Sequence, residues 1–233
     1  MSEATLIPST GTVARQPIAV APTPPASFVN RIINADCLDV LPELPSRSID
    51  FVFTDPPYLT RYRDRSGRTV ANDDQSSWVK PAFSQIYRVL KNHRFCVSFY
   101  GWSKVDQFFA AWRAAGFYPV AHLVWAKRYA SRQRYVAYHH EQAYVLAKGC
   151  PERPSIRLPD VLTWQYTENR LHPTQKPVSG LVPVVRTFSQ PGDVVLDPFC
   201  GSGSTLVAAQ SLGRRYIGIE IDAEHTKVAQ VRL

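Results

Sequence analysis

Apolar residues along the chain alternate between short continuous runs and stretches with helical spacing. Residues 49–54 (IDFVFT) form a largely apolar run of strand length, which is typical of a strand buried on both faces. Val79, Phe83, Ile86 and Leu90 recur at helical spacing instead. The same reading predicts further strands at residues 29–35, 95–100, 118–125, 142–147, 193–196 and 215–220, and helices at 37–44, 78–90, 105–115, 177–189, 204–212 and from 223 onward.

Two segments break this alternation. Residues 59–77 are polar and rich in arginine without a period, and residues 150–170 are the least regular part of the chain. We interpret the first as a loop. Because strands and helices alternate through most of the rest, we predict an α/β fold with a mainly parallel sheet, which binds ligands beyond the carboxyl ends of its strands.

Length and composition fit an ordinary globular protein. The chain has 233 residues, of which 45% are hydrophobic and 20% charged, and no apolar run reaches the length of a membrane span. We expect a disordered tail at residues 1–28, rich in Pro, Thr, Ser and Ala, and a single domain at residues 29–233. The four scattered cysteines form no CxxC pair, predict no metal site, and fit a reducing cytoplasm.

The net charge of +8, from 27 basic and 19 acidic residues, hints at a polyanionic partner such as nucleic acid. Basic proteins that bind no nucleic acid are also common. Charge alone therefore leaves this question open.

Four acidic residues stand at or just beyond the ends of predicted strands: Asp36, Asp55, Asp197 and Glu220. A carboxylate at a buried sheet edge is costly unless something pairs with it, so the four together indicate a polar ligand. The alternative is that each caps the following helix. That alternative suits Asp36 but not Asp55, since Pro56 and Pro57 follow it.

The first motif is Thr54-Asp55-Pro56-Pro57-Tyr58, directly after the buried strand. Two prolines fix the backbone and remove two N–H donors, which leaves a rigid turn with carbonyl acceptors, a carboxylate and an aromatic ring. Such a turn suits an exocyclic amine on a flat heterocycle, with Asp55 and the Pro56 carbonyl accepting its hydrogens and Tyr58 stacking on the ring. A plain strand-to-loop turn is the alternative.

The second motif, VVLDPFCGSGST, reads as a strand, a glycine-rich turn and a helix. Gly201 and Gly203 let the backbone approach a ligand closely. Leu206 stands where a dinucleotide fingerprint has its third glycine, and no Gly-Lys-Ser/Thr of a phosphate loop is present. Glu220 is placed like an acid that bonds ribose hydroxyls. A nucleoside without an essential phosphate therefore fits both the position of Glu220 and the missing phosphate-binding signatures.

The third motif, His172-Pro173-Thr174-Gln175-Lys176-Pro177, precedes a predicted helix. Thr174 or Gln175 can satisfy free N–H groups at the helix start, and Lys176 offers a positive charge to a carboxylate. Taken alone, this segment reads most simply as a capping loop.

Together, TDPPY, HPTQKP, LDPFCGSGST and IGIEID resemble the β-class amino-methyltransferases of DNA, from about Asn30 to the C-terminus. The resemblance implies a Rossmann-like seven-stranded sheet with helices on both faces, circularly permuted so that the catalytic motif precedes the cofactor motif. It also implies S-adenosylmethionine as the methyl donor and adenine N6 or cytosine N4 as the acceptor. In this family DPPY leans toward adenine and SPPY toward cytosine.

The resemblance assigns roles to individual residues. It implies a catalytic set and a set that binds the cofactor's ribose, methionine part and adenine. The catalytic residues are Asp55, Pro56, Pro57 and Tyr58, and the cofactor-binding residues are Asp36, Cys37, His172, Thr174, Lys176, Asp197, Phe199, Gly201, Gly203, Ser204, Thr205 and Glu220.

The expected partner is double-stranded DNA, from which the target base must be flipped out. Two basic segments are candidates for phosphate contacts, with a solvated surface as the alternative for each. They are Arg61, Arg63, Arg65 and Arg68, and Lys127, Arg128, Arg132 and Arg134. The resemblance implies a target-recognition region between the catalytic half and the HPTQKP motif. Only about residues 129–171 are available for it. A short site, loose specificity or a homodimer that shares the reading would each fit this shortness.

The leading hypothesis is therefore a DNA adenine-N6 methyltransferase in the cytoplasm of a bacterium, or encoded by a phage or plasmid. One alternative keeps the chemistry and changes the acceptor to cytosine N4. The other is a DNA-binding regulator built on an inactive methyltransferase, which the intact Asp55, Gly201, Gly203 and Glu220 argue against.

Overall fold

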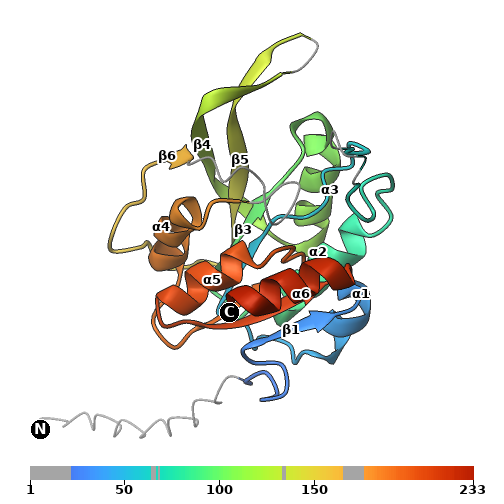
Figure 1. Cartoon of the computed structure of the whole chain (residues 1–233). Helices are drawn as coiled ribbons and strands as arrows, with labels where there is room; N and C mark the ends of the chain where they lie inside the picture. The colour runs from blue at the N-terminus through green and yellow to red at the C-terminus, as the bar shows by residue number, and fades with distance from the viewer. Residues whose placement is uncertain (1–21, 64–66, 68, 133–134, 165–175) are drawn as a thin grey trace, which may run out of the picture.

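The computed structural model describes residues 22–63, 67, 69–132, 135–164 and 176–233. Within these residues, eight strands form one sheet in the order β1-β8-β7-β2-β3-β5-β4-β6 (Figure 1). The strands are β1 (Arg31–Asn34), β2 (Phe51–Thr54), β3 (Arg94–Phe99), β4 (Tyr118–Arg132), β5 (Ala137–Lys148), β6 (Val161–Trp164), β7 (Val194–Asp197) and β8 (Arg215–Glu220).

The strand pairings confirm a mainly parallel sheet. Only β5, among the strands described, runs against the others, because it pairs antiparallel with both β3 and β4. The pairs β1/β8, β8/β7, β7/β2, β2/β3 and β4/β6 are all parallel. The carboxyl ends of β1, β8, β7, β2 and β3 therefore meet at one edge.

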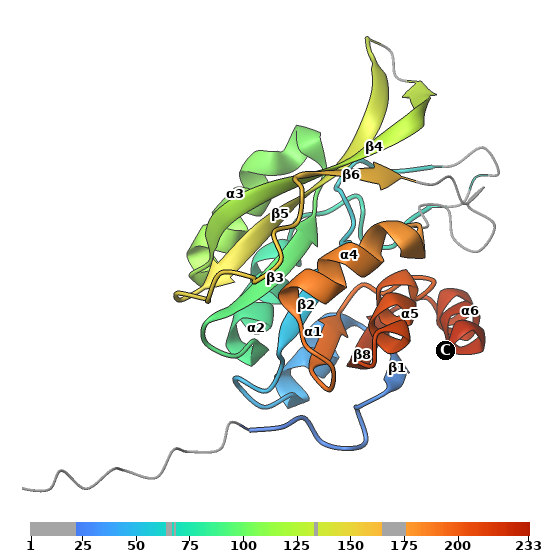
Figure 2. The same ribbon diagram turned by 90° about the vertical axis from the view of Figure 1, so that its left-hand side faces the viewer.

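Helices cover both faces of the sheet, as Figures 1 and 2 show. One apolar cluster joins the sheet to α1, α2 and α3, and a second joins it to α4 and α5. The helices are α1 (Cys37–Val40), α2 (Val79–Val89), α3 (Val105–Ala115), α4 (Val178–Phe188), α5 (Ser204–Ser211) and α6 (Ala223–Arg232), with short 3-10 turns η1 (Leu41–Glu43) and η2 (Trp102–Lys104).

The apolar pattern explains the best-matched elements. All residues of β2 and β7 are buried, as expected for strands sandwiched between two helical layers. Helix α3 has the bounds that its apolar spacing predicts, and it ends at Gly116, whose φ of 103° is a left-handed conformation that favours glycine.

The sheet has one strand more than the seven expected. The short strand β6 lies within the irregular segment 150–170 and pairs in parallel with β4. Strands β4 and β5 are also longer than predicted, and their far halves project beyond the rest of the molecule as a hairpin (Figures 1 and 2). The basic residue Lys127 at an inward position hid this continuation, because it interrupts the apolar alternation.

The amino-terminal tail lies mostly outside the described residues. Where the description begins, Phe28 packs against the core and Pro24 is buried. No helix in the described part of the chain is long and apolar enough to cross a membrane.

Candidate active site

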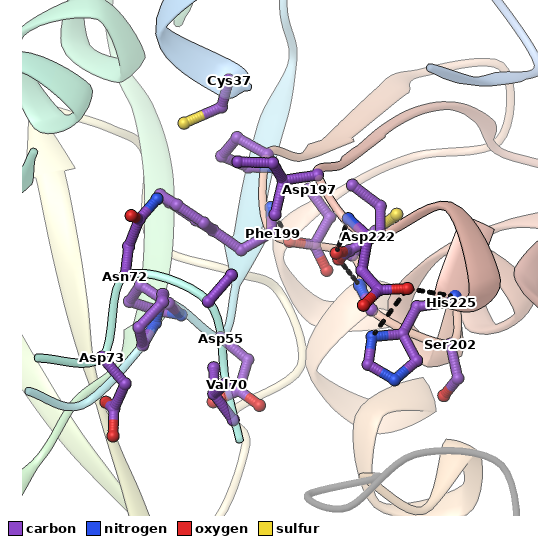
Figure 3. Close-up of a pocket in the computed structure, with 18 of the residues that line it drawn as sticks. Cys37, Asp55, Val70, Asn72, Asp73, Asp197, Phe199, Ser202, Asp222 and His225 are labelled. Carbon is purple, nitrogen blue, oxygen red and sulfur yellow. Dashed lines mark hydrogen bonds and ion pairs between the residues drawn. The ribbon is translucent and has the colours of Figure 1, made fainter. Parts of the chain in front are cut away.

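One cavity at the carboxyl edge of the sheet collects the four strand-end acids. Asp36 and Asp55 follow β1 and β2, Asp197 and Glu220 are the last residues of β7 and β8, and all four line the cavity. Figure 3 shows Asp55 and Asp197 there. Asp36 also caps α1, since it accepts a hydrogen bond from the Leu38 N–H at 2.8 Å. The capping interpretation is thus confirmed for Asp36, while its contact with a ligand stays a prediction.

The TDPPY motif and Lys176 form a compact charged cluster. Asp55 Oδ1 accepts a hydrogen bond from the Tyr58 hydroxyl at 2.7 Å, and Asp55 Oδ2 lies 2.5 Å from Lys176 Nζ. Lys176 is buried and lies over the rings of Tyr58 and Phe99, 5.4 and 4.8 Å from their centroids. The resemblance assigned Lys176 to the cofactor, and in the structure Lys176 also pairs with Asp55, 121 residues earlier in the sequence.

The electrostatics of this cluster are set by burial and by Lys176. Burial raises the pKa of the Asp55 carboxyl above its usual range, while the charge of Lys176 and the hydrogen bonds from Lys176 and Tyr58 counteract the rise. Burial and the neighbouring Asp55 charge raise the pKa of Tyr58 well above its ordinary value. Tyr58 therefore stays a neutral hydrogen-bond donor, and Lys176 favours the ionised form of Asp55.

Main-chain groups hold the carboxylate at the other end of the cavity. Glu220 Oε2 accepts from the Gly201 N–H and Oε1 accepts from the Asp222 N–H, each at 2.8 Å. Burial raises the pKa of the Glu220 carboxyl, and these two hydrogen bonds oppose the rise. Backbone hydrogen bonds thus fix the Glu220 carboxylate to the glycine-rich turn.

Asp197, at the end of β7, is almost fully buried, with 2% of its surface exposed. Its Oδ1 accepts from the Phe199 N–H at 3.1 Å, which shapes the turn into the glycine-rich segment. Burial raises the pKa of Asp197 to about 7, although hydrogen bonds from neighbouring groups oppose the rise.

Gly203 has a packing role in the structure. Phe199, Gly201, Ser204 and Thr205 line the cavity, but Gly203 does not. A Cβ on Gly203 would lie 3.0 Å from the Ala229 Cβ of α6, and its φ is +78°. Its missing side chain therefore lets α6 pack against the turn, and the cofactor contact expected of Gly203 stays a prediction.

The loop at residues 59–77 supplies cavity residues that the sequence did not reveal. Thr60, Tyr62 and residues 69–73 line the cavity opposite Asp222 and His225 (Figure 3). Buried Asp73 organises the loop, accepting from the Tyr62 N–H at 2.6 Å and the Thr60 hydroxyl at 3.1 Å. Short polar residues followed by an acid are a weak signal for such a turn, so the sequence offered little to find them by.

The expected DNA contacts fall into three groups. Arg61, Arg63 and Arg128 are exposed. Lys127 is buried, with its Nζ 2.6 Å from Glu141 Oε1 and lying over the rings of Tyr129 and Trp164, so its charge is already compensated inside the protein. Arg65, Arg68 and Arg134 lie outside the described residues, and Arg132 is described only as part of β4. His172 and Thr174, which the resemblance assigned to the cofactor, also lie outside the described residues.

Comparisons with known proteins agree with this geometry. Residues 49–231 match the model of a protein family described as DNA methylase. The chain is 53% identical over 205 residues to "Putative methylase YubD" of Escherichia coli (strain K12), covering 88% of this chain and 90% of that protein. It is 28% identical over 250 residues to Type II methyltransferase M.HinfI of Haemophilus influenzae, covering 88% and 68%.

Solved structures share the fold at low sequence identity. The M1.HpyAVI–SAM complex has a TM-score of 0.70 and 22% identity, over 87% of this chain and 98% of that chain. The PvuII DNA methyltransferase (cytosine-N4-specific) has a TM-score of 0.72 and 18% identity, over 87% and 85%. These likenesses support the Rossmann-like architecture of the sheet.

Proposed function

Because the chain belongs to the DNA methylase family, we propose that it transfers a methyl group from S-adenosylmethionine to N6 of an adenine flipped out of double-stranded DNA. One observation carries this proposal. The carboxylate of Asp55, held by Lys176 and Tyr58, opens into the same cavity as Glu220 and the glycine-rich turn. A group that binds at one end of the cavity therefore faces the catalytic turn at the other.

The described residues fit the proposed methyl donor. The Glu220 carboxylate suits ribose hydroxyls, and the cavity wall formed by Cys37 and Phe199 suits a flat adenine ring. The sulfonium of S-adenosylmethionine supplies an electrophilic methyl group. Its presence in the solved complex of M1.HpyAVI, a protein of the same fold, supports this choice.

The catalytic turn acts on the acceptor amine. The Asp55 carboxylate has acceptor capacity beyond its bonds to Tyr58 and Lys176, so it can take one N–H of the amine while the Pro56 carbonyl takes the other. Holding both hydrogens draws the nitrogen toward tetrahedral geometry and frees its lone pair for attack. Most of the acceleration then comes from alignment of amine and methyl group. Asp55 need not be a strong base, because the methylated amine loses its proton readily.

Cysteine nucleophiles have no part in this reaction. Burial raises the pKa values of the Cys37 and Cys200 thiols above their ordinary value, so both stay protonated. Each lines the cavity as a small apolar group. The reaction is thus a direct displacement without a covalent intermediate on the enzyme.

The second candidate is a cytosine-N4 methyltransferase. The fold similarity to the cytosine-N4-specific PvuII enzyme favours it, whereas the aspartate of DPPY favours adenine through the family resemblance. Incubation of the purified protein with S-adenosylmethionine and unmodified genomic DNA, followed by nucleoside mass spectrometry, tests both. N6-methyladenine supports our proposal, and N4-methylcytosine replaces it with the second candidate. The absence of both methylated bases contradicts both candidates.

A homodimer and a recognition region within residues 129–171 stay predictions.

A further inference from the structure

An exposed tryptophan stands at the active edge of the sheet. The chain has five tryptophans, all of them described; Trp102 is 59% exposed and the other four are buried. Trp102 lies in η2, directly after β3, and its ring lies 5.7 Å from that of Tyr138 on β5, with 32° between the planes. The two rings form a small aromatic platform, which we call the Trp102 platform.

The catalytic turn fixes the position of this platform. Gly101 packs so closely on the turn that a Cβ there would lie 2.5 Å from the Tyr58 carbonyl oxygen and 2.9 Å from the Tyr58 Cβ. Only one peptide separates this contact from Trp102. The platform therefore keeps a fixed relation to Tyr58, although it lies outside the catalytic cavity.

A polar groove extends from the cavity to the residues beside Trp102. Thr60 lines both the cavity and the groove, which continues along Arg61, Gln75 and Gln107 to Ser103 and Lys104, the two residues that follow Trp102 in η2. Arg61 and Lys104 outweigh the one acidic residue of the lining, Asp74. Side-chain amides, hydroxyls and a net positive charge are the groups that contact phosphate and sugar oxygens.

Together these features match an unpaired nucleotide of the DNA. Removing a base from the duplex leaves its neighbours and its former partner without their stacking contacts. Aromatic side chains beside a positive groove bind such bases without regard to sequence. Charge complementarity along the groove favours DNA over an apolar protein partner.

We propose that the Trp102 platform stacks on a base left unpaired when the target base is flipped, and that the adjoining groove contacts the phosphates of that strand. This inference rests on the proposed function, because it requires DNA with an opened base pair. It adds a binding site outside the catalytic and cofactor motifs.

The test compares three labelled duplexes of one length by fluorescence anisotropy at fixed salt. One is fully paired, one has a central bubble of mismatched bases, and one has the same bubble made of abasic nucleotides. We expect the wild type to prefer the base-containing bubble to the abasic one by roughly tenfold, the effect of one stacked base. Trp102→Ala should abolish this preference, and Trp102→Phe should keep most of it.

Tyr118→Ala is the matched control. Tyr118 is exposed like Trp102, but it begins β4, at the opposite end of the sheet. It should leave the preference unchanged. The inference is overturned if Trp102→Ala retains the wild-type preference for the base-containing bubble. It is also overturned if the variant weakens binding to all three duplexes equally. The same holds if the variant changes only the oligomeric state.

Methylation of genomic DNA by the wild type separates this inference from the proposed function. If the wild type methylates DNA while Trp102→Ala keeps the wild-type preference, only the platform is wrong. If the wild type neither binds nor methylates DNA, both proposals are wrong.

Discussion

The two ends of the cavity hold their carboxylates by different means. At the glycine-rich end, Glu220 accepts from the backbone N–H groups of Gly201 and Asp222. At the catalytic end, Asp55 is held by two side chains, the Tyr58 hydroxyl and the Lys176 ammonium group. Backbone donors are fixed by the fold, whereas side-chain donors change with single substitutions.

This difference indicates a division of labour. A carboxylate held by the backbone is suited to rigid recognition of a ligand, because its position does not depend on any one neighbour. A carboxylate held by a buried lysine and a tyrosine is suited to chemistry, because its pKa is set by burial and by those two neighbours. We therefore expect substitutions at the two ends to separate cofactor binding from methyl transfer.

The largest effect is expected at the catalytic end. Asp55→Asn keeps the shape but removes the charge, so methyl transfer at saturating cofactor should fall by roughly 10²–10⁴. Cofactor affinity, measured by calorimetry, should stay within about threefold, since Glu220 and its partners are untouched. Thermal melting checks the fold, because Lys176 loses its buried partner. An equal loss of cofactor affinity would refute the division.

At the backbone-held end, Glu220→Gln should weaken cofactor binding by about 10- to 100-fold, because hydrogen bonds to a charged acceptor are lost and an amide N–H₂ is left facing a backbone N–H. The rate at saturating cofactor should stay near that of the wild type. Titration calorimetry and single-turnover rates measure the two quantities. A slow rate that saturation does not restore speaks against the assignment of Glu220 to binding.

A smaller effect concerns pH. The charge of Lys176 lowers the pKa of Asp55, so Lys176→Met should raise that pKa. Because the ionised carboxylate accepts a hydrogen bond from the amine, activity is lost as the pH falls through this pKa. The acidic limb of the rate profile should therefore move to higher pH.

Two variants control for the removal of a buried ion pair. Lys176→Arg keeps the charge and should leave the limb near its original pH. Lys91→Met breaks the Lys91–Asp50 pair, whose atoms lie 2.6 Å apart away from the cavity, and should not move the limb. A limb unmoved in Lys176→Met means that Lys176 does not tune Asp55.

The smallest effect tests the support of the glycine-rich turn. Gly203→Ala places a Cβ against Ala229 and forces a left-handed backbone, which should cost about 1–2 kcal/mol of stability. Cofactor affinity should fall only a few-fold. Gly213→Ala is the matched control, since Gly213 has a φ of +74° with nothing within 4 Å of the added Cβ. Equal losses of affinity in both variants would show that the Ala229 contact has no influence on the site.

Residues that follow buried parallel strands could be located from the sequence. Asp55, Asp197 and Glu220 come directly at the ends of apolar runs, and parallel strands bring such ends to one edge. Chain direction and side-chain period are local properties, so the sequence carries this information openly.

Contacts between distant segments could not be located in this way. The pairing of Lys176 with Asp55 joins residues 121 positions apart, and the contact of Gly203 with Ala229 depends on how α6 packs. Residues 69–73 line the cavity because Asp73 folds the loop around itself. Strand β4 was predicted too short because a buried, ion-paired Lys127 resembles a solvated one in sequence.

The most direct test of the two-ended site is the single-turnover rate of methyl transfer to DNA at saturating cofactor in three proteins: wild type, Asp55→Asn and Glu220→Gln. We predict that Glu220→Gln reaches nearly the wild-type rate, because its defect lies in binding, while Asp55→Asn stays at least about 100-fold slower. If both variants recover at saturation, or both remain equally slow, the two ends of the cavity do not divide binding from chemistry.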